Sequence, residues 1–158
     1  MADQDWTPSL VEERLAEAAD VLKRLPDDTL QGYFSTWPAV LLEFSDLVGQ
    51  EPPRMKRPWP SAAAISRMEE TLDWPKMLDP LDARILWLRA AGERWKTICW
   101  KVGLQRAAAH EHWLYGLCVL AWKLNGRHVP ARRSKRHVIA MVRGKLADRG
   151  LAYPHLRS

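Results

Sequence analysis

The sequence predicts an all-α protein, a helical bundle that contains a helix-turn-helix and has a basic C-terminal extension. Apolar residues recur at steps of three and four in several windows, which is the period of an amphipathic helix. No strand-like alternation of any length is present. We divide the chain into an N-terminal helical scaffold with a Pro-rich linker (1–60), a helix-turn-helix domain (61–126) and a basic tail with a short helix (127–158).

Three helices are expected in the first half of the chain. The first begins at Thr7-Pro8, because threonine is a good N-cap and proline suits the first helical position, and it stops at Pro26. A short second helix is predicted over 37–48. The proline-rich segment 50–60 follows as a stiff linker. A third helix is predicted over 62–73, where a Trp-Pro pair breaks it.

The segment 80–125 predicts three further helices separated by short turns. The first starts at Pro80 and ends at Gly92, and the second runs from Arg94 to Val102. Gly103 then predicts a tight or left-handed corner, which residues with a Cβ atom resist. The third helix is expected from about Arg106 to Asn125. A last helix is suggested by the apolar spacing of Val138, Met141, Val142 and Leu146.

Two helices joined by a short glycine-containing turn are typical of a helix-turn-helix. In that motif the second helix enters the major groove of DNA, and residues near its N-terminus contact base edges. We expect Gln105, Arg106, His110 and His112 to be exposed there and to contact bases. Arginine suits bidentate contact with guanine, and glutamine suits adenine.

Charge is distributed unevenly along the chain. The net charge of the 158 residues is +5, yet residues 1–50 carry ten acidic and three basic side chains, while residues 119–158 carry one acidic and ten basic ones. Such asymmetry fits a basic end that faces a polyanion and an acidic end that faces water or a partner. The predicted phosphate contacts are Lys96, Lys101, Arg127, Arg132, Arg133, Lys135 and Arg136.

The stretch GERWKTICWKVGLQRAAAHEHW resembles the helix-turn-helix of sigma-factor region 4 and related bacterial regulators. The residues that match the pattern are Arg94, Trp95, Lys96, Ile98, Gly103 and Arg106. Gln105 and Ala108 stand where that pattern has serine and threonine. About residues 6–138 also resemble an uncharacterised family of small bacterial and phage-borne proteins. The resemblance implies a DNA-binding fold by analogy and brings no known activity.

Several classes of protein are not indicated by the sequence. It contains no signal-peptide pattern and no apolar run of the roughly 18 residues that span a bilayer, so a cytoplasmic location is expected. With only Cys99 and Cys118, no disulfide framework is predicted. Their spacing with the histidines, C-x10-H-x-H-x5-C, matches no common zinc pattern. We therefore expect no metal, no cofactor and no enzymatic activity.

The sequence favours a DNA-binding protein, a transcriptional regulator of bacterial or phage type whose partner is double-stranded DNA. One alternative is a DNA-packaging adaptor similar to a small terminase, which would assemble with itself or with a protein partner through the acidic N-terminal helix. A second alternative is a protein-binding helical bundle without a nucleic-acid partner. No membrane partner is expected.

Overall fold

The computed structural model describes residues 5–25 and 57–147. Within these ranges the chain forms six α-helices and no strand, so the all-α prediction is confirmed. In chain order the elements are α1 (Pro8–Arg24), α4 (Ala62–Leu72), the short 3-10 helix η2 (Trp74–Met77), α5 (Pro80–Ala90), α6 (Trp95–Val102), α7 (Arg106–Leu124) and α8 (Lys135–Ala147). The helix predicted over 37–48 lies outside the described residues, as does most of the proline-rich segment 50–60.

The ends of these helices follow local capping rules. The hydroxyl of Thr7 accepts a hydrogen bond of 3.2 Å from the backbone N–H of Leu10, which satisfies a free donor in the first turn of α1. Asp79 occupies the N-cap position of α5 in extended conformation, but its side chain makes no capping bond. Gly103 ends α6 with φ 69°, so the predicted left-handed corner is confirmed.

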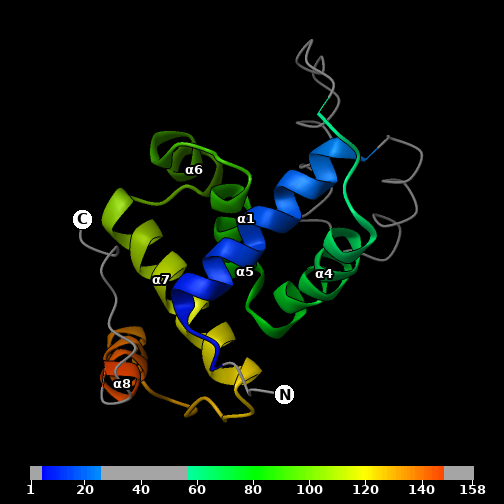
Figure 1. The fold of residues 1–158 in the computed structure, drawn as a ribbon. Coiled ribbons are helices and arrows are strands. Elements are labelled where there is room, and N and C mark those ends of the chain that lie inside the picture. The colour runs from blue at the N-terminus through cyan, green and yellow to red at the C-terminus, as the bar shows by residue number, and fades with distance from the viewer. Residues whose placement is uncertain (1–4, 26–56, 148–158) are drawn as a thin grey trace.

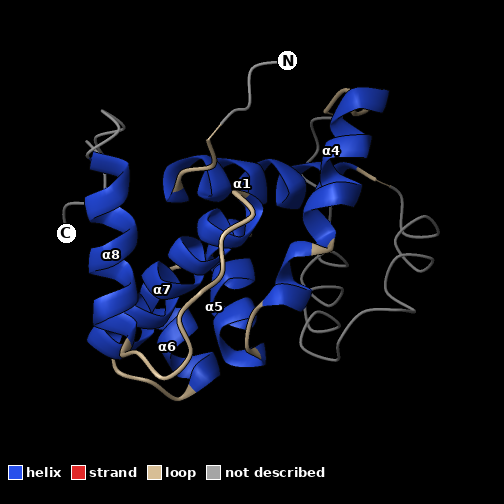
Figure 2. Cartoon of the chain, turned by 90° about the horizontal axis from the view of Figure 1, so that it is seen from below, coloured by secondary structure: helices blue, strands red, loops and turns tan. Residues whose placement is uncertain are grey.

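Helix α7 is the central element of the bundle. It packs against α1, α5, α6 and α8, and α1 also packs against α4 and α5. Figure 1 shows α1 crossing the bundle between α4 and α7, and Figure 2 shows α4 and α8 on opposite sides of it. One hydrophobic cluster contains buried residues from all six helices, so the described helices share a single core.

Two sets of polar contacts fix α1 on the later helices. The side chain of Asn125, just after α7, accepts a hydrogen bond of 2.7 Å from the backbone N–H of Trp6 and donates one of 2.9 Å to its carbonyl. At the other end of α1, the Lys23 ammonium donates to the carbonyl of Ala91, 2.6 Å away. The first helix therefore packs directly on the segment that contains α5 to α7.

Several tryptophans contribute to the core, whereas Trp59 and Trp100 are exposed. Trp87, Trp113 and Trp122 are buried, as large aromatic side chains in helices usually are. Trp100 is 83% exposed. Because residues two apart on a helix point about 200° apart, Trp100 lies on the outer side of α6 when Ile98 is fully buried.

None of the helices in 5–25 and 57–147 combines the length and the apolar character needed to cross a membrane.

Candidate nucleic-acid interface

The turn between α6 and α7 presents the first turn of α7 to solvent. The backbone N–H groups of Gly103 and Leu104 both donate to the carbonyl of Cys99, at 2.9 and 3.2 Å, which closes the end of α6. Gln105 and Arg106 follow, and both are exposed. Gln105 occupies the N-cap position without a side-chain capping bond. Both side chains therefore face solvent at the start of α7.

His110 is less exposed than the sequence prediction required. Its ring lies between two tryptophans, with centroids 5.5 Å from Trp95 and 5.2 Å from Trp113. Burial lowers the pKa of His110, and the positive charges of Arg143, Arg106 and Arg89 lower it further. The expectation of a solvent-facing side chain is wrong here because α6 packs its first residue over the ring. His110 is neutral at neutral pH.

His112 is held inside the bundle, and its expected exposure is also wrong. Its side chain is 19% exposed, and Nδ1 lies 2.5 Å from a carboxylate oxygen of Asp82, which is 2% exposed. The Lys135 ammonium lies 3.1 Å from Nδ1 and 3.2 Å from Nε2 of the same ring. This cluster joins α5, α7 and α8. This cluster was not predicted from the sequence, because no local pattern pairs residues 30 positions apart.

Four of the seven predicted phosphate contacts are exposed on the described surface: Lys96, Arg132, Arg133 and Arg136. Arg136 lies 3.3 Å from a carboxylate oxygen of Glu111, and its side chain is 88% exposed. An ion pair with so much solvent around it contributes little to stability and leaves the guanidinium accessible.

The other three predicted phosphate contacts are engaged within the protein. Lys101 lies 3.2 Å from a carboxylate oxygen of Glu93. The guanidinium of Arg127 stacks 4.7 Å from the ring centroid of Trp122, which is a cation–π contact. Lys135 belongs to the Asp82–His112 cluster. The number of basic residues in the sequence therefore overestimates the positive charge that is accessible to a polyanion.

The segment predicted as a basic tail with a short helix contains α8, and its residues 148–158 lie outside the described residues. Lys135 begins α8, and the backbone N–H of His137 donates a hydrogen bond of 3.2 Å to the hydroxyl of Ser134. Arg132 has φ 65°, a left-handed conformation that non-glycine residues seldom adopt. This turn directs the chain back so that α8 packs against α7.

The acidic side of α1 is partly neutralised by arginines. The guanidinium of Arg67 contacts the carboxylate of Glu17 at 2.6 Å, and this hydrogen bond lowers the pKa of Glu17. Asp20 is paired with Arg57 at 2.6 Å and with Arg24 at 3.1 Å. Two of the four acidic side chains of α1, Glu17 and Asp20, are therefore paired with arginines of the same chain.

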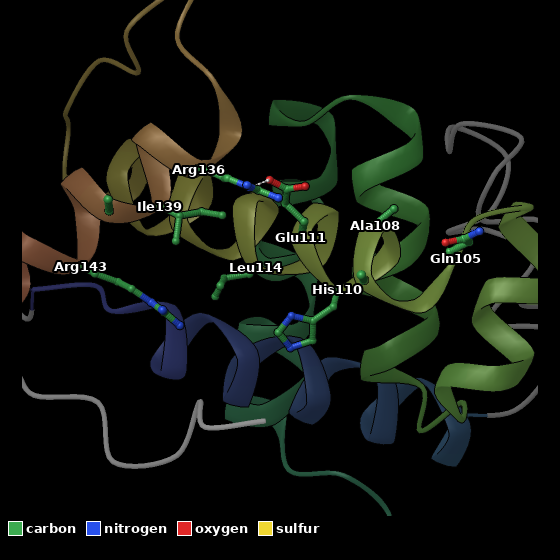
Figure 3. A pocket seen from close by; sticks show the side chains of 10 residues that line it. Gln105, Ala108, His110, Glu111, Leu114, Arg136, Ile139 and Arg143 are labelled. Carbon is green, nitrogen blue, oxygen red and sulfur yellow. Dashed lines mark hydrogen bonds and ion pairs between the residues drawn. The ribbon is translucent and has the colours of Figure 1, made fainter.

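An open groove of about 740 Å³ lies between the start of α7 and α8. Leu114 and Ile139 line its middle. Figure 3 shows the Arg136–Glu111 pair on one side of these two residues, and Arg143 and His110 on the other. Arg143 is not among the contacts predicted from the sequence.

The cysteines differ in burial. Cys118 is fully buried in α7, and burial raises the pKa of its thiol to about 12, whereas Cys99 is partly exposed. Within the described ranges, no three His, Cys, Asp or Glu side chains converge on one point.

Comparisons with known proteins identify one family. Neither the search of curated proteins nor the search of solved structures returned a match. A family model described as "Domain of unknown function (DUF6362)" matches residues 23–120, more than half of the 158 residues. The match extends through α4, α5, α6 and most of α7, and it stops before α8. The chain therefore belongs to the DUF6362 family of domains of unknown function.

Proposed function

We propose that this protein binds double-stranded DNA through a helix-turn-helix formed by α6, the turn at Gly103 and the start of α7, and that it acts as a transcriptional regulator. The observation that carries the proposal is the exposed pair Gln105 and Arg106 on the first turn of a helix that enters the core behind them. Residues in that position of a helix-turn-helix contact base edges. Within the described ranges, Arg106 forms no ion pair that would hold it away from DNA.

The proposed base contacts are concentrated on Gln105 and Arg106. His110 and His112 were expected to share this role, but their rings are engaged with tryptophans and with Asp82 respectively. Ala107 is exposed and small, so it leaves room for the edge of a base pair beside Arg106. The guanidinium of Arg106 is best suited to a bidentate contact with guanine.

The proposed phosphate contacts come from both sides of this turn. Lys96 is exposed on α6, and Arg132 and Arg133 are exposed in the loop before α8. Cations in such positions neutralise phosphates and fix the orientation of the protein without selecting a sequence. We assign the protein a binding role and no catalytic one.

A packaging adaptor that assembles through the acidic helix is less well supported. Self-association through α1 needs free carboxylates, and Glu17 and Asp20 are already paired with arginines of the same chain. These pairs are partly exposed and contribute little to stability, but they partly neutralise the charge that would attract a basic partner to α1. The regulator is therefore preferred.

The test is a fluorescence anisotropy titration of the full chain with random-sequence duplex DNA at two salt concentrations. We expect binding at low salt that weakens steeply as salt rises, because counterions are released from the DNA. A double variant, Arg132→Gln with Arg133→Gln, should reduce the salt slope by roughly 1.8, about 0.9 for each lost phosphate contact.

The matched control is Arg57→Gln with Lys76→Gln. It removes the same amount of charge from two exposed residues that precede α5 in the chain. We expect this control to bind DNA as the native chain does. Absence of binding by the native chain at low salt would contradict the proposal. An equal reduction of the salt slope in both double variants would show that DNA binding depends only on the net charge of the protein.

A further inference from the structure

One face of α8 lines the groove between α7 and α8, and this face carries an arginine at each end. Arg136, Ile139, Ala140 and Arg143 all line it. These positions are spaced three, one and three residues apart, so they share one side of the helix, and the two arginines lie roughly 10 Å apart along its axis. The opposite wall is the start of α7, where Ala107 and Ala108 keep the groove open. Figure 3 shows Leu114 and Ile139 between the two walls.

Arg143 is the cation in this groove that the described residues leave without an acidic partner. It is partly buried, and within 5–25 and 57–147 it forms no ion pair. Figure 3 shows its side chain reaching from α8 toward the side of the groove where His110 lies. Arg136, at the other end, contacts Glu111 only through an exposed pair. A half-buried guanidinium that pairs with no carboxylate of the described residues favours an anion nearby.

The surroundings of His110 indicate a positive potential at the same end of the groove. Arg89 from α5, Arg106 from α7 and Arg143 from α8 each disfavour its protonated form. The acidic groups nearby are Glu111, which is paired with Arg136, and Glu12 of α1, whose pKa is raised by burial. Glu12 interacts with the charge of Arg89, and Glu111 is paired with Arg136, so Arg106 and Arg143 are the arginines at His110 for which no acidic partner lies among the described residues. Charge complementarity therefore points to an anionic ligand.

We propose that this groove holds the phosphodiester backbone of one DNA strand, with Arg143 and Arg136 as its cations. This inference rests on the proposed DNA binding. It adds a second contact surface beside the base-contacting turn, because α8 lies along the same segment of α7 that begins with Gln105 and Arg106. When the first turn of α7 enters the major groove of a DNA duplex, one of the two phosphodiester backbones beside that groove would lie against α8.

The experiment compares Arg143→Gln with Lys76→Gln in anisotropy titrations with random-sequence duplex DNA over a series of salt concentrations. Lys76 is an exposed cation on η2, near the C-terminal end of α7, where Lys123 donates to the carbonyl of Met77. We expect Arg143→Gln to weaken binding roughly tenfold at low salt on every sequence and to reduce the salt slope by about 0.9. Arg143→Lys should retain the slope, and Lys76→Gln should match the native chain.

A second measurement follows the His110 ring by NMR. In the free protein, Arg143→Gln should raise the pKa of His110, because a like charge is removed. Addition of duplex DNA to the native chain should also raise this pKa, because a bound phosphate offsets the three arginines. This readout reports on the groove itself, so it separates a lost phosphate contact from a general loss of stability.

The outcomes distinguish the two proposals. If the native chain binds DNA while Arg143→Gln keeps the native affinity and salt slope, the groove assignment is overturned and the helix-turn-helix proposal stands. DNA binding that leaves the pKa of His110 unchanged also overturns it. If the native chain binds no duplex DNA at low salt, both proposals fail.

Discussion

The two halves of α7 have opposite surroundings. In the segment from Gln105 to His112 only Ala109 is buried, and the first three residues are exposed. In the segment from Trp113 to Leu124 nearly every side chain is buried, with Leu117 and Leu120 fully so. One helix therefore serves as the centre of the core at one end and as the candidate contact surface at the other.

This difference explains how a short exposed turn can be held in a defined position. Helix α7 packs against α1, α5, α6 and α8, so its axis is fixed by packing rather than by its own helix propensity. A contact surface built on such a helix keeps its geometry more closely than one on a loop. Changes in the buried half should affect stability, and changes in the exposed half should affect binding.

The largest effect should come from the buried half. We expect Leu117→Ala to lower the free energy of unfolding by about 2–5 kcal/mol, because a fully buried leucine leaves a cavity. Urea denaturation measures the change. The matched variant in the exposed half, Ala107→Ser, should stay within about 0.5 kcal/mol of the native protein. Equal losses of unfolding free energy in both variants would contradict the distinction between the buried and the exposed half of α7.

His112 tests where the boundary between the halves lies. Replacing it with alanine leaves the carboxylate of Asp82 buried without its imidazole partner, so we expect a loss of about 1–3 kcal/mol in unfolding free energy. Thermal or urea unfolding would show this loss. If the stability is unchanged and the preference for one base pair is altered, His112 would instead be a DNA contact, as the sequence predicted.

Arg106 tests the exposed half. We expect Arg106→Ala to leave stability near the native value and to lose about 1–3 kcal/mol of discrimination at a single base pair. The measurement is a competition series with duplexes that differ from a selected binding site by one base pair each. Lys96→Ala is the control, since a phosphate contact weakens binding on all sequences alike. The same uniform weakening in Arg106→Ala would argue against a base contact.

The smallest effect concerns pH and His110. Its pKa is lowered in the folded protein, so below roughly pH 6.5 the unfolded chain takes up the proton more readily and stability falls as pH falls. His110→Gln should remove this contribution, and the stabilities of the two proteins should diverge between pH 7 and 5. Parallel pH profiles in urea denaturation would contradict a pKa of His110 that is lowered by burial and by the nearby arginines. Glu12, whose raised pKa acts in the opposite direction, is common to both proteins.

Much of the fold was predictable because its signals are local. Thr7 and Ser61 cap their helices within three residues, and Gly103 adopts the conformation that only glycine adopts without strain. The exposure of Gln105 and Arg106 follows from the same corner. Exposure further along α7 was mispredicted, because helical spacing identifies which residues share a face but not which helix covers that face.

The sequence by itself determined the helical class, the positions of the described helices and the uneven charge along the chain, because helical periodicity, capping residues and charge act over a few neighbouring positions. The tertiary structure decided which of those charges are available. Lys101, Arg127 and Lys135 became internal contacts when α6, α7 and α8 packed, whereas Arg143 became part of a groove. The contact of Lys135 with His112 joins residues 23 positions apart, and the contacts of Lys101 with Glu93 and of Arg127 with Trp122 depend on how the chain turns at a helix end. Only the folded arrangement brings these groups within the few ångströms over which hydrogen bonds, ion pairs and cation–π contacts act.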